Sequence, residues 1–188
     1  MISKYQVPMP NKLLCVYCSS STSLDPKYFA MAEAVGHGLV ARGWGLIYGG
    51  GCRGLMGSVA RAVHKSGGHV IGIIPDFMKA REWAYIEADE LVTVETMRER
   101  KQIMESRAEA FLTLPGGIGT LEEMSEIVVL RSLEVITKPL VLLNQDGFYD
   151  DYIRLLERMA GENFIPRGGD RLLSVARTLD EAWDKLGG

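Results

Sequence analysis

Short apolar runs alternate along this chain with longer segments whose apolar residues recur at helical spacing. The runs of strand length are 13–18, 45–48, 69–74, 91–94, 110–114, 139–143 and, more weakly, 172–175. The segments with helical periodicity are 26–42, 55–66, 96–107, 121–133 and 149–160. The pattern therefore predicts strands and helices in alternation.

Continuous apolar strands joined by crossover helices are typical of a parallel sheet that is buried on both faces. We predict a single α/β domain over residues 13–188, a doubly wound parallel sheet with helices on both faces, after an N-terminal extension at 1–12. Ligands of such sheets bind beyond the carboxyl ends of the strands. The loops after the apolar runs are therefore where chemistry is expected.

Two of these loops are rich in glycine. One is Gly49–Gly57, with the sequence GGGCRGLMG, and the other is Pro115–Glu123, with the sequence PGGIGTLEE. Glycine lets a backbone approach a ligand closely, and the amides at the start of the following helix attract a phosphate. Neither loop is a Walker A motif or a dinucleotide fingerprint. Each loop predicts a phosphate site or, alternatively, only a tight turn.

Charged residues accompany both loops. Glu122 and Glu123 are expected in the first turn of a helix, where they either complement the helix dipole or supply the carboxylate that N-glycoside cleavage requires. Arg98, Arg100 and Lys101 begin the helix after the fourth strand. They form either a solvated helix face or an anion site.

Composition narrows the classes of function. A net charge of −3 argues against general nucleic-acid binding. The absence of a long apolar run and of a secretory signal predicts a cytoplasmic protein that does not span a membrane. The three cysteines favour reduced thiols, and the three histidines lack metal-ligand spacing, so we expect no metal site. The irregular stretch 76–89 is expected to form a lid or a short helix.

The three motifs GGGxxGLMG, MxxRK and PGGxGTxxE, in this order, resemble the Lonely Guy family of cytokinin riboside 5′-monophosphate phosphoribohydrolases, often labelled possible lysine decarboxylases. The resemblance covers roughly residues 13–156. It implies a Rossmann-like fold that hydrolyses AMP, or N6-substituted AMP, to a free base and ribose 5-phosphate. It also implies a homodimer or larger assembly, with the helix 124–133 as a candidate interface, and no metal or organic cofactor is expected.

Carried over to this chain, the resemblance implies Arg100 and Glu123 as the catalytic residues. The substrate contacts that we expect are Ser20, Gly50, Gly51, Glu82, Arg100, Lys101, Gly116, Gly117, Ile118, Gly119, Thr120, Leu121, Glu122 and Glu123.

The chain departs from the family's usual pattern at three positions, where it carries Ser19, Arg98 and Val129. These changes bear on base specificity more than on the reaction. No lysine site for pyridoxal phosphate is present to support a decarboxylase. The alternative function is a non-catalytic carrier of a nucleotide or of the molybdenum cofactor, because related folds with similar loops are binding proteins.

Overall fold

Every apolar run that we predicted as a strand forms one. The computed structural model describes residues 10–79, 83–165 and 172–187. Its strands are β1 (Lys12–Tyr17), β2 (Trp44–Tyr48), β3 (Val70–Pro75), β4 (Glu90–Val94), β5 (Ala110–Thr113), β6 (Leu140–Leu143) and β7 (Ser174–Ala176). They form a seven-stranded sheet in the order β4-β3-β2-β1-β5-β6-β7, with parallel pairing. The predicted α/β class with a Rossmann-like parallel sheet is confirmed.

The predicted helices also form, with two differences. They are α1 (Pro26–Ala41), α2 (Gly54–Lys65), α4 (Met97–Arg107), α5 (Ile118–Ser132) and α6 (Asp150–Gly161). The pattern missed α7 (Leu179–Leu186), whose start is fixed by Thr178, a side-chain cap for the Glu181 amide. Helix α5 begins three residues before the predicted start, because the sequence GIGT was interpreted as loop.

The chain divides into two compact units that share β1. Unit 1 comprises residues 1–14 and 20–108, and unit 2 comprises 15–19 and 109–188. The predicted single domain over 13–188 stays a prediction.

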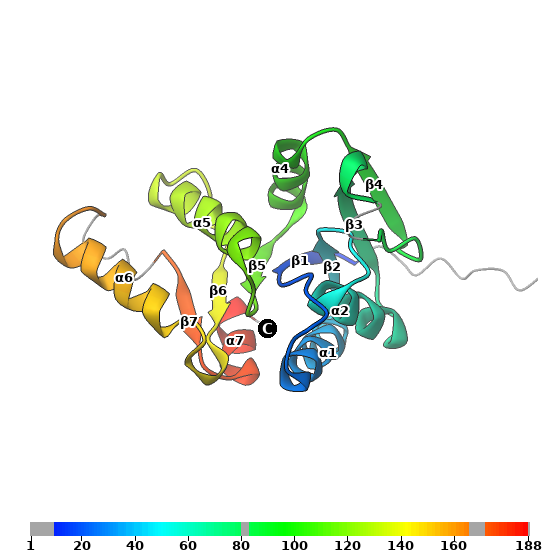
Figure 1. Ribbon diagram of the computed structural model, residues 1–188, viewed down its shortest axis with the longest axis horizontal. Coiled ribbons are helices and arrows are strands. Elements are labelled where there is room, and N and C mark those ends of the chain that lie inside the picture. Colours follow the sequence, from blue (N-terminus) through cyan, green and yellow to red (C-terminus); the bar gives the residue numbers. More distant parts are fainter. Residues whose placement is uncertain (1–9, 80–82, 166–171, 188) are drawn as a thin grey trace, which may run out of the picture. The chain divides into compact units, whose positions relative to one another are not determined.

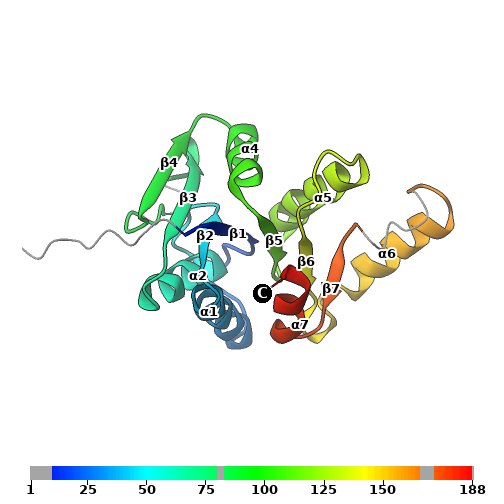
Figure 2. The ribbon, with the colours of Figure 1, turned by 180° about the vertical axis from the view of Figure 1, so that it is seen from behind.

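In unit 1, helices cover both faces of the strands. Figures 1 and 2 show α1 and α2 side by side on one face of β2 and β3, with α4 on the other face. All residues of β2 and β3 are buried. A methyl group on Gly36 of α1 would lie 2.6 Å from Ala62 Cβ and 2.7 Å from Val59 O of α2. This glycine therefore permits the close approach of the two helices.

Unit 2 is built around β5 and β6, whose residues are all buried. Tyr17 stacks on Phe111 with ring centroids 6.1 Å apart, and the Leu114 amide donates to Tyr17 O at 2.9 Å. Figures 1 and 2 show α5 and α7 on opposite faces of these strands. Helix α6 has no buried residue. Within the described part of the chain, no helix is both long and apolar enough to cross a membrane.

Candidate active site

The glycine loop after β2 holds a buried arginine. Arg100, on the first turn of α4, is 5% exposed, and its Nη2 donates to Gly49 O at 3.2 Å. A Cβ atom on Gly49 would overlap the guanidinium group in its present position, so glycine here leaves room for it. Arg98 is exposed and Lys101 is half-buried. A solvated helix face is therefore the wrong interpretation for Arg100. Its buried guanidinium group lies at the carboxyl end of β2.

The start of α4 fixes the position of Arg100. The Thr96 hydroxyl accepts from the Glu99 amide at 3.1 Å, and Glu99 Oε2 accepts from the Glu95 amide at 2.9 Å. The Thr96 cap satisfies an amide that has no partner within the helix, and the Glu99 side chain holds the residue before the cap. The local sequence ETMRE thus sets where the helix begins and which face Arg100 occupies.

The same glycine loop is bound to residues 83–85. The Cys52 amide donates to Trp83 O at 2.9 Å, the Tyr85 amide donates to Gly50 O at 2.8 Å, and Gly51 forms an antiparallel bridge with Ala84. Residues 76–78 form a short 3-10 helix, in line with the helical alternative for this stretch, and the lid stays a prediction. Glu82 lies outside the described residues, so its predicted role stays a prediction.

Ser20 contributes its backbone to the loop. Gly54, with φ at +56°, would place a Cβ atom 2.5 Å from the Ser20 carbonyl carbon. The left-handed conformation and the close backbone together require glycine. The structure therefore gathers Ser20, Gly50, Gly51 and Arg100 of the predicted site within unit 1.

The second glycine loop joins β5 to α5 in unit 2. Gly117 is the N-cap and, as glycine, supplies no side-chain cap, while Gly117, Ile118 and Gly119 are exposed. Thr120 is 4% exposed, and a Cβ atom on Gly116 would lie 2.5 Å from Thr120 Cβ. The loop thus presents backbone amides at a helix start, as a phosphate site requires.

The two glutamates of this loop lie beyond the first turn. Helix α5 begins at Ile118 and has no acidic residue in its first turn, so the predicted first-turn position of Glu122 and Glu123 is wrong. The interaction of a charge with the helix dipole falls off after the first turn. Complementation of the dipole is therefore a weaker explanation for these two glutamates. Glu122 is exposed and Glu123 is half-buried.

Glu123 faces the end of β1. Burial raises the pKa of the Cys18 thiol well above its ordinary value, and the negative charge of Glu123 raises it further. The pKa of Tyr17 is raised by burial first, with smaller contributions that include Cys15 and Glu123. Both groups therefore stay neutral beside the carboxylate. Cys18 and the other two cysteines form no disulfide.

Sequence reasoning missed Tyr149, which holds the loop of unit 2. Its hydroxyl donates to Leu114 O at 2.9 Å, and its amide donates to Asn144 Oδ1 at 2.7 Å. Burial raises the pKa of Tyr149, while a hydrogen bond with the Gly116 backbone opposes the rise. The only sequence signal was Asn144 directly after the sixth apolar run, at a carboxyl strand end.

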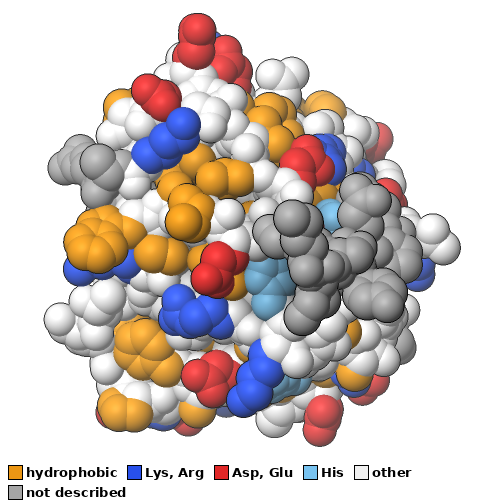
Figure 3. Space-filling view, turned by 90° about the vertical axis from the view of Figure 1, so that its right-hand side faces the viewer, with side chains coloured by type: hydrophobic (Ala, Val, Ile, Leu, Met, Phe, Trp, Pro, Cys, Tyr) orange, Lys and Arg blue, Asp and Glu red, His pale blue; other side chains and the backbone are white. Residues whose placement is uncertain are grey.

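Sequence reasoning also missed a hydrogen-bond network around His64. The spacing of the histidines along the sequence does not indicate it. His64 lies 2.8 Å from Tyr85 Oη and 3.0 Å from Asp89 Oδ2, which also accepts from the Val70 amide at 2.9 Å. Burial, with smaller contributions from the charge of Glu87 and a hydrogen bond to it, raises the pKa of Tyr85 to about 12, so the phenol stays protonated. His64 Nε2 donates to Asp89. Figure 3 shows exposed parts of histidine side chains beside acidic and basic side chains.

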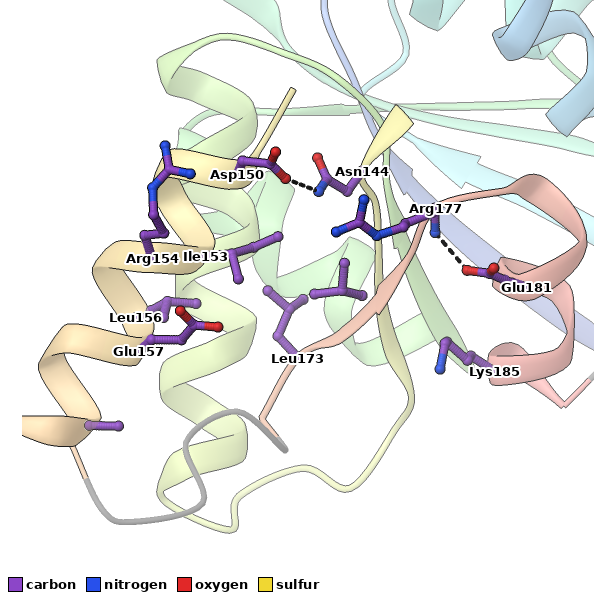
Figure 4. A pocket seen from close by; sticks show the side chains of 12 residues that line it. Asn144, Asp150, Ile153, Arg154, Leu156, Glu157, Leu173, Arg177, Glu181 and Lys185 are labelled. Atoms are coloured by element: carbon purple, nitrogen blue, oxygen red, sulfur yellow. Dashed lines mark hydrogen bonds between the residues drawn. The ribbon is translucent and has the colours of Figure 1, made fainter. Parts of the chain in front are cut away.

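A separate cavity of about 870 Å³ lies in unit 2, between α6, the end of β6, β7 and α7. Figure 4 shows Ile153, Leu156 and Leu173 on its walls, with Asn144 bonded to Asp150 and the Arg177 amide bonded to Glu181. None of the residues predicted for the site lines it. The cavity is therefore separate from the site that the loops predict.

Curated relatives are similar over most of the chain. A cytokinin riboside 5′-monophosphate phosphoribohydrolase from Oryza sativa subsp. japonica is 43% identical over 173 residues, which are 92% of this chain and 72% of that protein. An enzyme with the same description from Mycobacterium marinum is 41% identical over 169 residues, 90% of each chain.

Solved structures with this fold include carriers of a cofactor. The molybdenum cofactor carrier protein from Chlamydomonas reinhardtii has a TM-score of 0.71 at 18% identity, covering 94% of this chain and 96% of that chain. The molybdenum cofactor binding protein from Rippkaea orientalis has a TM-score of 0.66 at 20% identity, covering 92% and 93%. At such identities the likeness concerns the fold alone.

A family model described as possible lysine decarboxylase matches residues 56–186, which contain both the MxxRK and the PGGxGTxxE motifs. Together with relatives above 40% identity along about nine-tenths of the sequence, this match shows that the chain belongs to the possible lysine decarboxylase family, to which the Lonely Guy motifs of the sequence had pointed.

Proposed function

We propose that the protein hydrolyses the N-glycosidic bond of a purine nucleoside 5′-monophosphate, AMP or its N6-substituted derivatives, to the free base and ribose 5-phosphate. The observation that carries the proposal is the half-buried Glu123, one turn beyond the uncapped start of α5. The names of the curated relatives support it. The proposed anchor is the 5′-phosphate, held by the exposed amides of Gly117–Gly119.

In the proposed reaction, water adds through its oxygen to C1′ of the ribose as the bond from C1′ to the base nitrogen breaks. The bonding electrons leave with the base, and a proton from the water ends on the base. The transition state resembles an oxocarbenium ion, which a carboxylate stabilises. Glu123 supplies that charge or accepts the proton of the water, and Arg100 orients the substrate.

The first test is release of adenine from AMP, followed by liquid chromatography, with adenosine as the control substrate. If phosphate binding positions C1′, kcat/KM for adenosine is expected to be lower by about 10²-fold or more. Equal values would mean that the glycine loops are only turns. Absence of adenine release from AMP and of N6-isopentenyladenine release from its N6-isopentenyl derivative would leave the carrier function as the alternative.

The roles of the two residues are tested by substitution. Glu123→Gln removes charge but keeps shape, so turnover is expected to fall by about 10²-fold or more while AMP binding persists. Arg100→Ala is expected to damage both KM and kcat. Gln102→Ala is the control for Arg100, since Gln102 is exposed on the same helix. Turnover by Glu123→Gln within a few-fold of the parent would exclude Glu123 as the catalytic carboxylate.

A further inference from the structure

An exposed tryptophan stands at the glycine loop of unit 1. Trp83 is 63% exposed, although burial of a large aromatic ring is favourable. Its φ angle of 51° lies in the left-handed region, which is unusual for a bulky residue and costs conformational energy. Strain of this kind persists where surrounding contacts impose it. The backbone at Trp83 is therefore held by its neighbours.

Those neighbours are the residues of the glycine loop. The carbonyl of Trp83 accepts from the Cys52 amide at 2.9 Å, and the next residues continue the pairing through Ala84 and Tyr85. The guanidinium carbon of Arg53 lies 5.5 Å from the centre of the indole ring. Arg53 covers one face of the ring, and the high exposure of Trp83 leaves indole surface accessible to a ligand.

The same loop binds Arg100 of α4, the buried arginine of the proposed site. Gly49, which accepts from Arg100, and Cys52, which donates to Trp83, are three residues apart at the carboxyl end of β2. This is the end of a parallel strand at which ligands bind. An aromatic face backed by a guanidinium group is a surface on which a purine base stacks.

We propose that Trp83, supported by Arg53, is the platform on which the base of the nucleotide stacks. This inference rests on the proposed function for the identity of the substrate. It assigns Trp83 to recognition of the base, and the large indole area suits a base that carries an apolar N6 substituent. Ribose 5-phosphate, which has no base, is expected to make no use of the platform.

Tryptophan fluorescence gives a direct test, since a stacked purine quenches an indole. The three tryptophans differ in exposure: Trp44 is 8% exposed and Trp183 is 3% exposed, so a ligand from solvent reaches Trp83 most readily. Titration of the full-length Glu123→Gln protein with AMP, which it turns over slowly, is expected to quench the fluorescence. Ribose 5-phosphate is expected to leave it unchanged. Trp83→Phe in the same background should abolish the quenching.

Kinetics with the parent protein give a second, independent measurement. Trp83→Leu is expected to raise KM for AMP by about tenfold, from the loss of base stacking, with kcat changed far less. Trp83→Phe, which keeps an aromatic face, should restore most of the affinity. Ile86→Ala is the matched control, because Ile86 is 85% exposed in the same segment.

Three results would each contradict the stacking role of Trp83. They are unchanged fluorescence with saturating AMP, quenching that persists in Trp83→Phe, and a parental KM in Trp83→Leu. Failure of the proposed function looks different. If AMP quenches the fluorescence through Trp83 but no adenine is released, base stacking on Trp83 is supported and the proposed hydrolysis is contradicted.

Discussion

At the scale of single residues, the glycines of the two loops have separate reasons to be glycine. Gly49 makes room for the Arg100 guanidinium group, and Gly116 makes room for Thr120. Gly119 is different, because an added Cβ atom would meet nothing within 4 Å and its φ is not in the left-handed region. No contact within the described part of the chain explains Gly119, whereas close approach of a phosphate would.

Gly119→Ala therefore separates function from stability. Alanine inside a helix is preferred over glycine by up to about 1 kcal/mol, so the variant is expected to be as stable as the parent or more stable. Turnover of AMP is expected to fall by about tenfold or more, since the new methyl group displaces the phosphate. Urea unfolding and adenine release measure the two effects.

Gly116→Ala serves as the contrasting variant. Its methyl group would lie 2.5 Å from Thr120 Cβ, so loss of about 1–3 kcal/mol of stability is expected along with lost activity. If Gly119→Ala kept full activity, the start of α5 would not be the phosphate site.

At the scale of elements, later parts of the chain fix the shape of each loop, one through a side chain and the other through backbone pairing. Tyr149, just before α6, bonds to Leu114 O between β5 and its glycine loop. Residues 83–85 pair with the glycine loop after β2. Both contacts join segments that are distant in the sequence.

Tyr149→Phe removes the hydroxyl that anchors the β5 loop. Stability is expected to fall by about 1 kcal/mol, as for one lost hydrogen bond. Because the loop binds the phosphate in the proposed mechanism, kcat/KM for AMP should fall more than stability alone explains. Tyr152→Phe is the control, since Tyr152 is half-buried and its hydroxyl lies 3.4 Å from Ser125 Oγ of α5. Equal activity of the two variants would contradict the anchoring role.

The network around Asp89 predicts a loss of stability in acid. Burial alone raises the pKa of Asp89, but hydrogen bonds from the Val70 amide and His64 outweigh it and hold the pKa below the ordinary value of 3.8. A carboxylate with a lowered folded pKa stabilises the protein fully above its unfolded pKa, and this contribution is lost as the pH falls through the folded pKa.

We therefore expect Asp89→Asn to be less stable than the parent at neutral pH, with the difference closing on acidification. Urea unfolding midpoints measured from about pH 7 to about pH 2 check this. Glu109→Gln, at an exposed position, should follow the parent at every pH. A difference between Asp89→Asn and the parent that persists at the lowest pH would show that the carboxylate charge is not its cause.

The elements could be predicted from the sequence because their signals are local. Apolar runs located all seven strands, since buried parallel strands are continuously apolar. The start of α5 was missed because glycine and isoleucine at its first positions lack a helical pattern. Helix α7 was missed although Thr178 and Glu181 form a readable cap.

The candidate site was less predictable. Motifs located Arg100 and the loop of Glu123, but the burial of Arg100 depends on Gly49 and the shape of the loops depends on Tyr149 and Trp83. Sequence spacing carries no information about such long-range contacts.

At the scale of the whole molecule, apolar side chains remain exposed on unit 2. On α5 and just after it, Val129, Leu133 and Val135 are 53%, 66% and 62% exposed, and Leu155 of α6 is 47% exposed. Scattered exposed apolar residues are ordinary, but several on neighbouring parts of one unit favour an interface. These residues include the end of the helix 124–133, which we predicted as a candidate interface.

We expect light scattering at micromolar concentration to give at least twice the 20.8 kDa mass of one chain. Leu133→Glu, which places a charge among these residues, should lower the mass toward that of one chain. Phe77→Glu in unit 1, where Phe77 is 57% exposed, should leave it unchanged. A parent protein that scatters as a single chain would contradict this prediction.

The division of β1 between the two units has a consequence for synthesis on the ribosome. Residues 15–19 are made early, yet the partners that they contact in unit 2, Phe111 and Leu114, emerge only after the rest of unit 1. Pairing over such a long stretch of chain is slow, because the loop must close before the contacts stabilise it. The carboxyl-terminal half of β1 therefore waits for β5, and a nascent chain released at Ala108 would leave Tyr17 without its stacking partner.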